Sequence, residues 1–215
     1  MDERNGGPTP RRLEGRYNLN TEKTARILFQ FLSSKTFEQP TTQWLNHSAS
    51  SSALSLQPPA PPTRHSSLLM LRATIANLLQ KYRDANGKVV HVQHIVPDGT
   101  PIFTPDTPLG DILPELKPQG SEAVIKKNHP SAFADTKLEE TLEAKSKIVL
   151  TGYMAHVCVS TTARDAARLG YDVVIPLDCI GDRDIPGAKG DEVVDMVAKE
   201  LGDAFGTIVQ SKDIK

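Results

Sequence analysis

One cysteine in the sequence lies where a nucleophile is readily activated. Cys158 is at the start of residues 157–169, a segment that ends at Gly170 and has the pattern of a capped helix. The first N–H groups of a helix are unpaired and carry the positive end of its dipole, which favours a thiolate. Cysteine is also a common small residue of protein cores. The position alone leaves both interpretations open, a nucleophile and a packed thiol.

The other candidate groups give weaker signals. Cys179 follows a predicted strand, has no basic neighbour before Arg183 and is predicted to be a packed thiol. His91 and His94 alternate with apolar residues, and residues three apart in a strand point to opposite faces, so we predict no shared metal and no metal site. His94 lies at the end of its strand and is a candidate for lining a pocket.

The candidate groups must be positioned by helices and strands, and these alternate along the chain. Apolar residues three and four apart predict a helix over 68–82, and a second such stripe predicts a helix over 191–205. Short apolar, β-branched runs predict strands at 24–32, 88–95, 123–125, 147–150, 172–177 and 207–209. This order predicts an α/β fold of three layers, αβα, with a mainly parallel, Rossmann-like central sheet and a site beyond the strands' C-terminal ends.

Length and composition set the domain boundaries. The chain has 215 residues, the size of one domain. Residues 1–20 are polar with Gly and Pro and are predicted to be a flexible tail, which leaves 21–215 as the domain. The Ser/Pro-rich stretch 40–67 lacks the apolar residues to order itself and is predicted to be a disordered insert. The Pro- and Gly-rich stretch 96–120 predicts a long loop of the kind that is often functional.

The charge balance and the apolar runs exclude some partners. The formal net charge is −1, so we expect no nucleic-acid partner. No run approaches the roughly 18 to 20 apolar residues of a membrane span, and the first residues, MDERNGGPTPRR, lack the apolar stretch of a signal peptide. We therefore expect a cytoplasmic protein without a membrane partner, with both cysteines as free thiols.

Three separated stretches resemble one enzyme family. TGYMAHVCVSTTARDA, residues 151–166, resembles the nucleophile segment of the isochorismatase-like cysteine hydrolases, which include nicotinamidases. KNHPSAF, from Lys127 to Phe133, is similar to the family's Lys-x-x-x-Ser-Ala-Phe motif. Residues 170–178 and 203–207 look like further family landmarks. The resemblance covers residues 68–214.

The resemblance implies a cofactor-independent hydrolase. Cys158 would be the nucleophile and Lys127 its basic partner, since a nearby ammonium stabilises a thiolate. The backbone N–H groups of Met154 and Cys158 would form the oxyanion hole, the first of them after a non-proline cis peptide at Tyr153-Met154. The substrate would be a small amide or an isochorismate-type molecule. In the isochorismatases a vinyl ether is cleaved, for which an acid matters more than a nucleophile.

The resemblance also implies the surroundings of the substrate and the assembly. Residues that flank the motifs or end a strand are candidates for contacting a small-molecule substrate: His94, Phe133, Tyr153 and His156, and in addition His129. Members of the family assemble as dimers or tetramers, which implies a homodimer or homotetramer here.

One family residue is missing from its expected place. The family's catalytic aspartate ends the first strand, in a motif resembling Leu-Leu-Val-Ile-Asp-Met-Gln, but here residues 24–31 read TARILFQF and no aspartate occurs between Asp2 and Asp84. Losing a general acid or base typically lowers a rate by ~10²- to 10⁴-fold. Two explanations stay open: a catalytically impaired or non-catalytic binding or scaffold version of the fold, or an altered N-terminal coding region in an enzyme.

Overall fold

The computed structural model describes residues 26–31, 64–96, 103–104, 106–108 and 110–214. The predicted tail at 1–20, and the predicted insert up to residue 63, lie outside the described residues. None of the helices within the described ranges is long and apolar enough to cross a membrane.

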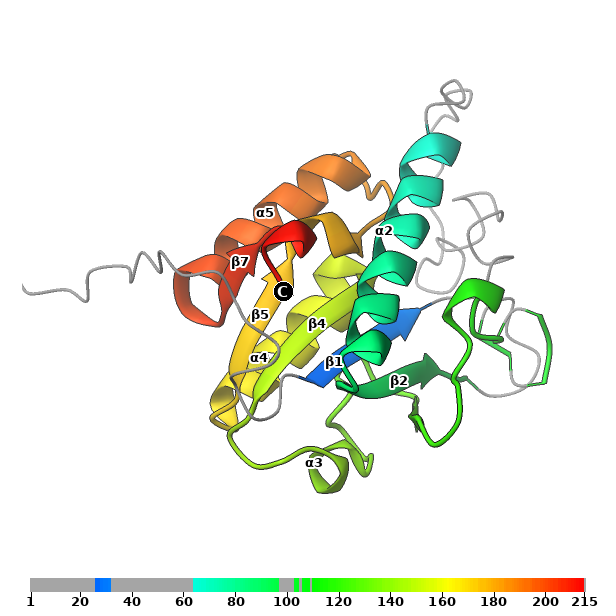
Figure 1. Ribbon diagram of the computed structural model, residues 1–215. Coiled ribbons are helices and arrows are strands. Elements are labelled where there is room, and N and C mark those ends of the chain that lie inside the picture. The colour runs from blue at the N-terminus through cyan, green and yellow to red at the C-terminus, as the bar shows by residue number, and fades with distance from the viewer. Residues whose placement is uncertain (1–25, 32–63, 97–102, 105, 109, 215) are drawn as a thin grey trace, which may run out of the picture.

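A single parallel sheet forms the centre of the fold. Its strands follow the spatial order β3-β2-β1-β4-β5-β7, and the short β6 pairs with the end of β4. In Figure 1 the blue β1 lies between β2 and β4. The strands are β1 (Arg26–Phe31), β2 (Lys88–His94), β3 (Ala123–Lys127), β4 (Lys147–Tyr153), β5 (Asp172–Pro176), β6 (Ile180–Gly181) and β7 (Thr207–Val209). These strands all pair in parallel, so their C-terminal ends share one edge of the sheet.

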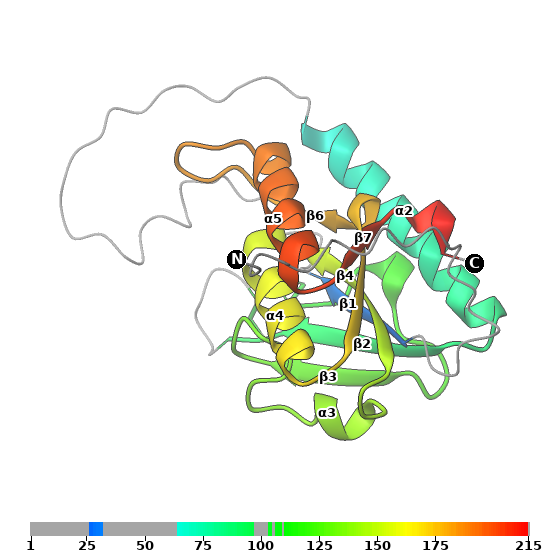
Figure 2. The same ribbon diagram turned by 90° about the vertical axis from the view of Figure 1, so that its left-hand side faces the viewer.

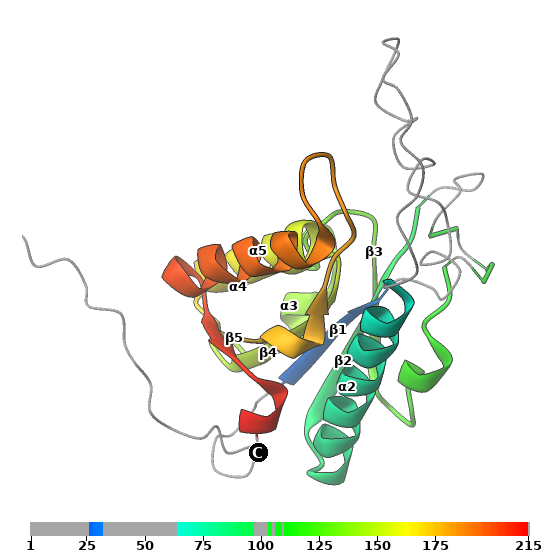
Figure 3. The same cartoon turned by 90° about the horizontal axis from the view of Figure 1, so that it is seen from above.

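Helices cover both faces of this sheet. Helix α2 (Arg64–Asp84) lies on one face, and α4 (Ser160–Arg168) and α5 (Gly190–Ala204) lie on the other, as Figure 3 shows from above. Figure 2 shows α4 and α5 side by side. Buried apolar residues accordingly form two clusters, one under α2 and one under α4, α5 and the short α3 (Leu138–Thr141). The predicted three-layer αβα fold with a parallel sheet is confirmed.

Three local predictions need correction. Helix α2 begins at Arg64, so the last four residues of the predicted insert 40–67 form its first turn. The sequence pattern did not predict this turn, because the apolar stripe of the helix starts only at Leu68 and the turn before it is polar. Strand β4 runs on to Tyr153, because Thr151 and the glycine after it are buried in the sheet rather than exposed in a loop. The predicted helix 157–169 is divided into a π-helical turn, Ala155–Val159, and α4.

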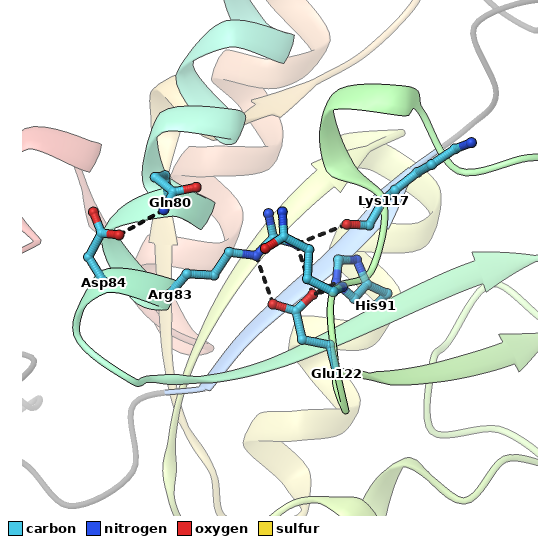
Figure 4. A network of polar contacts seen from close by, with 7 residues as sticks. Gln80, Arg83, Asp84, His91, Lys117 and Glu122 are labelled. Atoms are coloured by element: carbon cyan, nitrogen blue, oxygen red, sulfur yellow. Dashed lines mark hydrogen bonds and ion pairs between the residues drawn. The ribbon is translucent and has the colours of Figure 1, made fainter.

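A polar cluster fastens α2 to the strands that carry the candidate site. Glu122, just before β3, accepts hydrogen bonds from Arg83 of α2, with Nε and Nη2 each 2.8 Å from a carboxylate oxygen. Its Oε2 is also 2.8 Å from Nε2 of the buried His91 on β2. Arg83 additionally donates to the carbonyl of Lys117 (Figure 4). The cluster ties the helix, β2 and the entry to β3 into one unit.

Candidate active site

The candidate site lies where the C-terminal ends of the central strands meet. His94 and Lys127 are the last residues of β2 and β3 and are register partners. Cys158 follows the end of β4 and lies in the π-helical turn. Parallel pairing therefore brings groups from three distant parts of the sequence to one edge of the sheet, the usual place for sites in such folds.

The ammonium group of Lys127 lies beside the thiol of Cys158. Its Nζ is 3.2 Å from Cys158 Sγ, and the two residues are only 3% exposed. Nζ also donates to the carbonyls of His129, at 2.8 Å, and Pro130, at 2.9 Å. Burial lowers the pKa of Lys127, and the interaction with Cys158 partly offsets this. The structure brings together the two residues predicted to carry the chemistry.

His94 completes the surroundings of the lysine. Its Nδ1 is 3.0 Å from Lys127 Nζ, and its ring packs at 4.6 Å, centroid to centroid, against Phe103 of the long loop. Burial, then the charge of Lys127 and that of His129, lower the pKa of His94 to about 4. At neutral pH the imidazole is therefore uncharged.

The backbone around Cys158 departs from an ordinary helix start. The peptide bond between Tyr153 and Met154 is cis, as the family resemblance implies. The carbonyl of Met154 accepts the N–H groups of Val157 and Val159, and the second of these bonds closes the π-helical turn. The correction to the predicted helix 157–169 moves Cys158 from the first turn of an α-helix into this wider turn. Hydropathy spacing cannot distinguish the two turns over five residues.

His156 is held by a buried carboxylate that the sequence did not reveal. Asp182 Oδ2 accepts both the backbone N–H and, at 2.7 Å, the ring Nδ1 of His156. The other oxygen of Asp182 accepts the N–H of Arg183. The Asp182 side chain is fully buried, whereas that of His156 is 26% exposed. The imidazole is thus anchored at one nitrogen, two residues from Cys158.

The side chains of two predicted substrate-contact residues pack against the cores. The ring of Phe133 packs against Tyr171, with centroids 5.6 Å apart, in the cluster under α4 and α5. The side chain of Tyr153 lies in the cluster under α2, near Leu71 and Gly181. Their motif positions fix the backbone and not the direction of the side chain, and contact of either residue with a substrate stays a prediction. His129 contributes its carbonyl, and its half-exposed ring faces Asp135.

The remaining cysteine and histidine lie away from Lys127. Cys179 is fully buried in the core, where burial, followed by the charge of Asp178, raises the pKa of its thiol. His91 contacts Glu122 on the α2 side, while His94 contacts Lys127, so the prediction that they point to opposite faces is confirmed. The described part of the chain contains no cluster of three or more residues able to hold a metal ion.

Within the described ranges, no carboxylate side chain lies within hydrogen-bond distance of the lysine. Among the described residues, the hydrogen-bonding shell of Lys127 Nζ consists of two carbonyls, an imidazole and a thiol. Strand β1, whose family counterpart ends in aspartate, reads Arg26-Ile27-Leu28-Phe29-Gln30-Phe31 here.

Sequence reasoning missed Asp182 and Phe103. The run of charged residues 182–184 after a strand is a weak signal for a functional loop. Phe103 stands alone among prolines and glycines, and nothing in the sequence links it to His94.

This architecture is shared with solved structures. An isochorismatase from Pseudomonas putida KT2440 superposes with a TM-score of 0.70 at 25% identity, over 90% of this chain and 93% of that one. The fold therefore defines the class as that of the isochorismatase-like hydrolases. A family model described as the isochorismatase domain matches residues 61–213, and this chain belongs to the isochorismatase family.

Two relatives show the range within the family. The chain is 54% identical over 145 residues to the secreted isochorismatase effector Isc1 of Verticillium dahliae, a match that covers 66% of this chain and 76% of that protein. It is 36% identical over 115 residues to a streptothricin hydrolase of Streptomyces noursei, over 52% of this chain and 41% of that enzyme.

Proposed function

We propose that this isochorismatase-family hydrolase uses Cys158 as a nucleophile on a small amide or isochorismate-type substrate. The observation that carries the proposal is the 3.2 Å separation of Lys127 Nζ and Cys158 Sγ in a buried site. A positive charge held against a thiol favours the thiolate, which is the attacking species.

The geometry supports an acyl-transfer sequence. The thiolate of Cys158 forms a bond to the carbonyl carbon, and the developing oxyanion receives the N–H groups of Met154 and Cys158. The leaving amine takes a proton as its C–N bond breaks. Lys127 is the acid placed to give it, since burial lowers the pKa of its ammonium. Water then hydrolyses the thioester and returns Cys158 and Lys127 to their starting forms.

The names of relatives support two substrate classes. The Streptomyces relative is named a hydrolase of streptothricin, and a Pseudomonas putida relative 30% identical over 124 residues is named maleamate amidohydrolase. The Verticillium relative is named an isochorismatase. A cysteine nucleophile suits the hydrolysis of amides. Cleavage of a vinyl ether needs an acid instead, and Lys127 could serve as that acid.

One pair of assays tests this proposal. The full chain is incubated with isochorismate and with a panel of small amides, and pyruvate and ammonia are measured beside Cys158→Ala and Lys127→Met. Ammonia release lost in Cys158→Ala supports the nucleophile. Pyruvate release that survives in Cys158→Ala but not in Lys127→Met assigns acid chemistry to the same site. Absence of turnover on every substrate, or turnover that both variants retain in full, overturns the proposal, and absence favours the non-catalytic binding alternative.

Assembly and location remain predictions. We propose a homodimer or homotetramer, which sedimentation of the purified chain tests directly. The cytoplasmic location expected from the sequence is opposed by the name of the Verticillium relative, a secreted effector. Fractionation of cells that express the full-length protein decides between the two.

A further inference from the structure

The lysine of the candidate site has more acceptors around it than hydrogens to give. A lysine ammonium has three N–H donors and no acceptor. Four atoms lie within 3.2 Å of Lys127 Nζ: the carbonyl oxygens of His129 and Pro130, Nδ1 of His94 and Sγ of Cys158. Two hydrogens are committed to the carbonyls, at 2.8 and 2.9 Å. The third is left between the imidazole and the thiol.

The direction of the bond to His94 follows from the protonation states. When Lys127 is charged, only the ammonium has a hydrogen to give, so Nδ1 of a neutral imidazole accepts it and Nε2 carries the ring proton. A protonated ring would instead place an N–H and a second positive charge 3.0 Å from Nζ. The ammonium is therefore held at this spot only while the ring is neutral.

Every group that the structure places against His94 favours the neutral ring. Lys127 faces it from β3, and His129 acts on it from the segment after that strand. Phe103, itself buried, packs against the ring from the long loop. The ring of His129 is itself paired with the carboxylate of Asp135. His94 is thus a partly buried acceptor beside a cation.

We propose that His94 is the positioning residue of this site: its Nδ1 holds the third N–H of Lys127. This rests on the proposed function in treating Cys158 as the nucleophile. As Sγ bonds to a substrate carbon it ceases to be an anionic acceptor, and Nδ1 of His94 remains to receive the hydrogen. The third hydrogen of Lys127 therefore keeps an acceptor until it passes to the leaving amine.

Two substitutions of His94 separate this role from a structural one. His94→Asn keeps an acceptor, because Oδ1 of asparagine is as many bonds from the backbone as Nδ1 of histidine, and it cannot titrate. His94→Leu keeps the bulk and removes the acceptor. The readout is the rate at which iodoacetamide alkylates Cys158 between pH 5 and 9, with Cys158→Ala as the background and thermal melting as the check on folding.

The expected result is a split between the two variants. In His94→Leu the ammonium is poorly held, so we expect alkylation at pH 7.5 to fall about tenfold, the scale set by losing a hydrogen bond to a charged group. Its pH profile should move upward by about one unit. In His94→Asn the alkylation rate at pH 7.5 should stay within about threefold of the wild-type rate, and the pH profile should keep its wild-type position. A folded His94→Leu with the wild-type profile, or a folded His94→Asn no better than His94→Leu, overturns the proposal.

Alkylation needs no substrate, so this outcome is independent of the turnover assays. A shifted profile in a protein without turnover would leave the role of His94 standing and remove the proposed substrates. Turnover that is unaffected in His94→Leu would remove the role of His94 and leave the proposed function.

Discussion

The carboxylate of Asp182 holds both the backbone N–H and the ring Nδ1 of His156, a residue 26 positions earlier in the chain. This double contact joins the loop after β6 to the turn that carries Cys158. Since the carboxylate is fully buried, its charge depends on these donors and on the N–H of Arg183.

Asp182→Asn should therefore destabilise the fold. The asparagine amide removes the negative charge and places an N–H₂ group beside the N–H donors of His156 and Arg183. Losing hydrogen bonds to a buried charged group costs about 1–3 kcal/mol. Urea unfolding of the variant beside the wild type measures the loss. Asp203→Asn, on the exposed surface of α5, is the matched control and should unfold at the wild-type midpoint. Equal midpoints for Asp182→Asn and the control would contradict the expectation.

The two cysteines should differ in reactivity. Cys158 lies beside an ammonium, whereas burial raises the pKa of the Cys179 thiol and no part of Cys179 is exposed. Mass spectrometry after iodoacetamide at pH 7.5 should find one modified thiol per native chain, at Cys158, and two in denaturant. In Cys158→Ala the native chain should stay unmodified. Comparable labelling of Cys179 in the native protein would refute this.

Acid should loosen the polar cluster between α2 and β2. Burial would raise the pKa of Glu122, but the hydrogen bonds from Arg83, the Gln119 N–H and His91 outweigh it and lower the pKa to about 2. Glu122 thus contributes stability above its unfolded pKa of about 4.5, and this is lost as the pH falls toward 2. Burial also lowers the pKa of His91, so protonation in the unfolded state favours unfolding below about pH 6.5.

The matching variant is Glu122→Gln. It should lower the free energy of unfolding at pH 7 by about 1–3 kcal/mol, since a buried hydrogen-bonded charge is lost. Between pH 5 and 3 its stability should fall less steeply than that of the wild type. Urea midpoints at several pH values measure both, with the exposed Glu140→Gln as the control. Parallel pH curves for Glu122→Gln and the wild type would rule out the assigned role.

Gly181 of β6 should not tolerate a methyl group. A Cβ there would collide with Leu71 Cδ2 and lie 3.2 Å from Tyr153 Cδ2. Overpacking of this kind typically costs 1–3 kcal/mol. Because Tyr153 precedes Met154 in the proposed oxyanion hole, Gly181→Ala should also slow turnover. Thermal melting measures the loss of stability, and the ammonia assay measures turnover. An unchanged melting temperature would show that the core accommodates the methyl group and would contradict the prediction.

Periodicity and strand composition were enough to predict the layers of the fold. The stripe of α2 and the β-branched run of β2 survive in the structure with shifts of a few residues, since burial selects the same side chains that the pattern shows. The meeting of Lys127 and Cys158 followed from two motifs and from parallel strands sharing an edge.

Side-chain direction and long-range polar contacts were beyond the sequence. Tyr153 and Phe133 lie in matching motifs, but their rings pack into the cores on opposite faces of the sheet. The contact of Asp182 with His156 joins loops that no periodic pattern relates. The π-helical turn around Cys158 differs from an α-helix by a single residue in its hydrogen bonding, which hydropathy does not record.

The central place of β1 has a consequence for how the protein is made. Arg26 pairs with Lys88 on one side and with Ile148 on the other, so both neighbours of β1 come later in the chain than β1 itself. Until it is inserted, the sheet is two separate halves, with His94 and Lys127 on one and Cys158 on the other. Such distant pairings form slowly. The thiol and its ammonium can therefore meet only after β1 has paired on both sides, so the site is assembled by the slowest contacts of the sheet and not by either half alone.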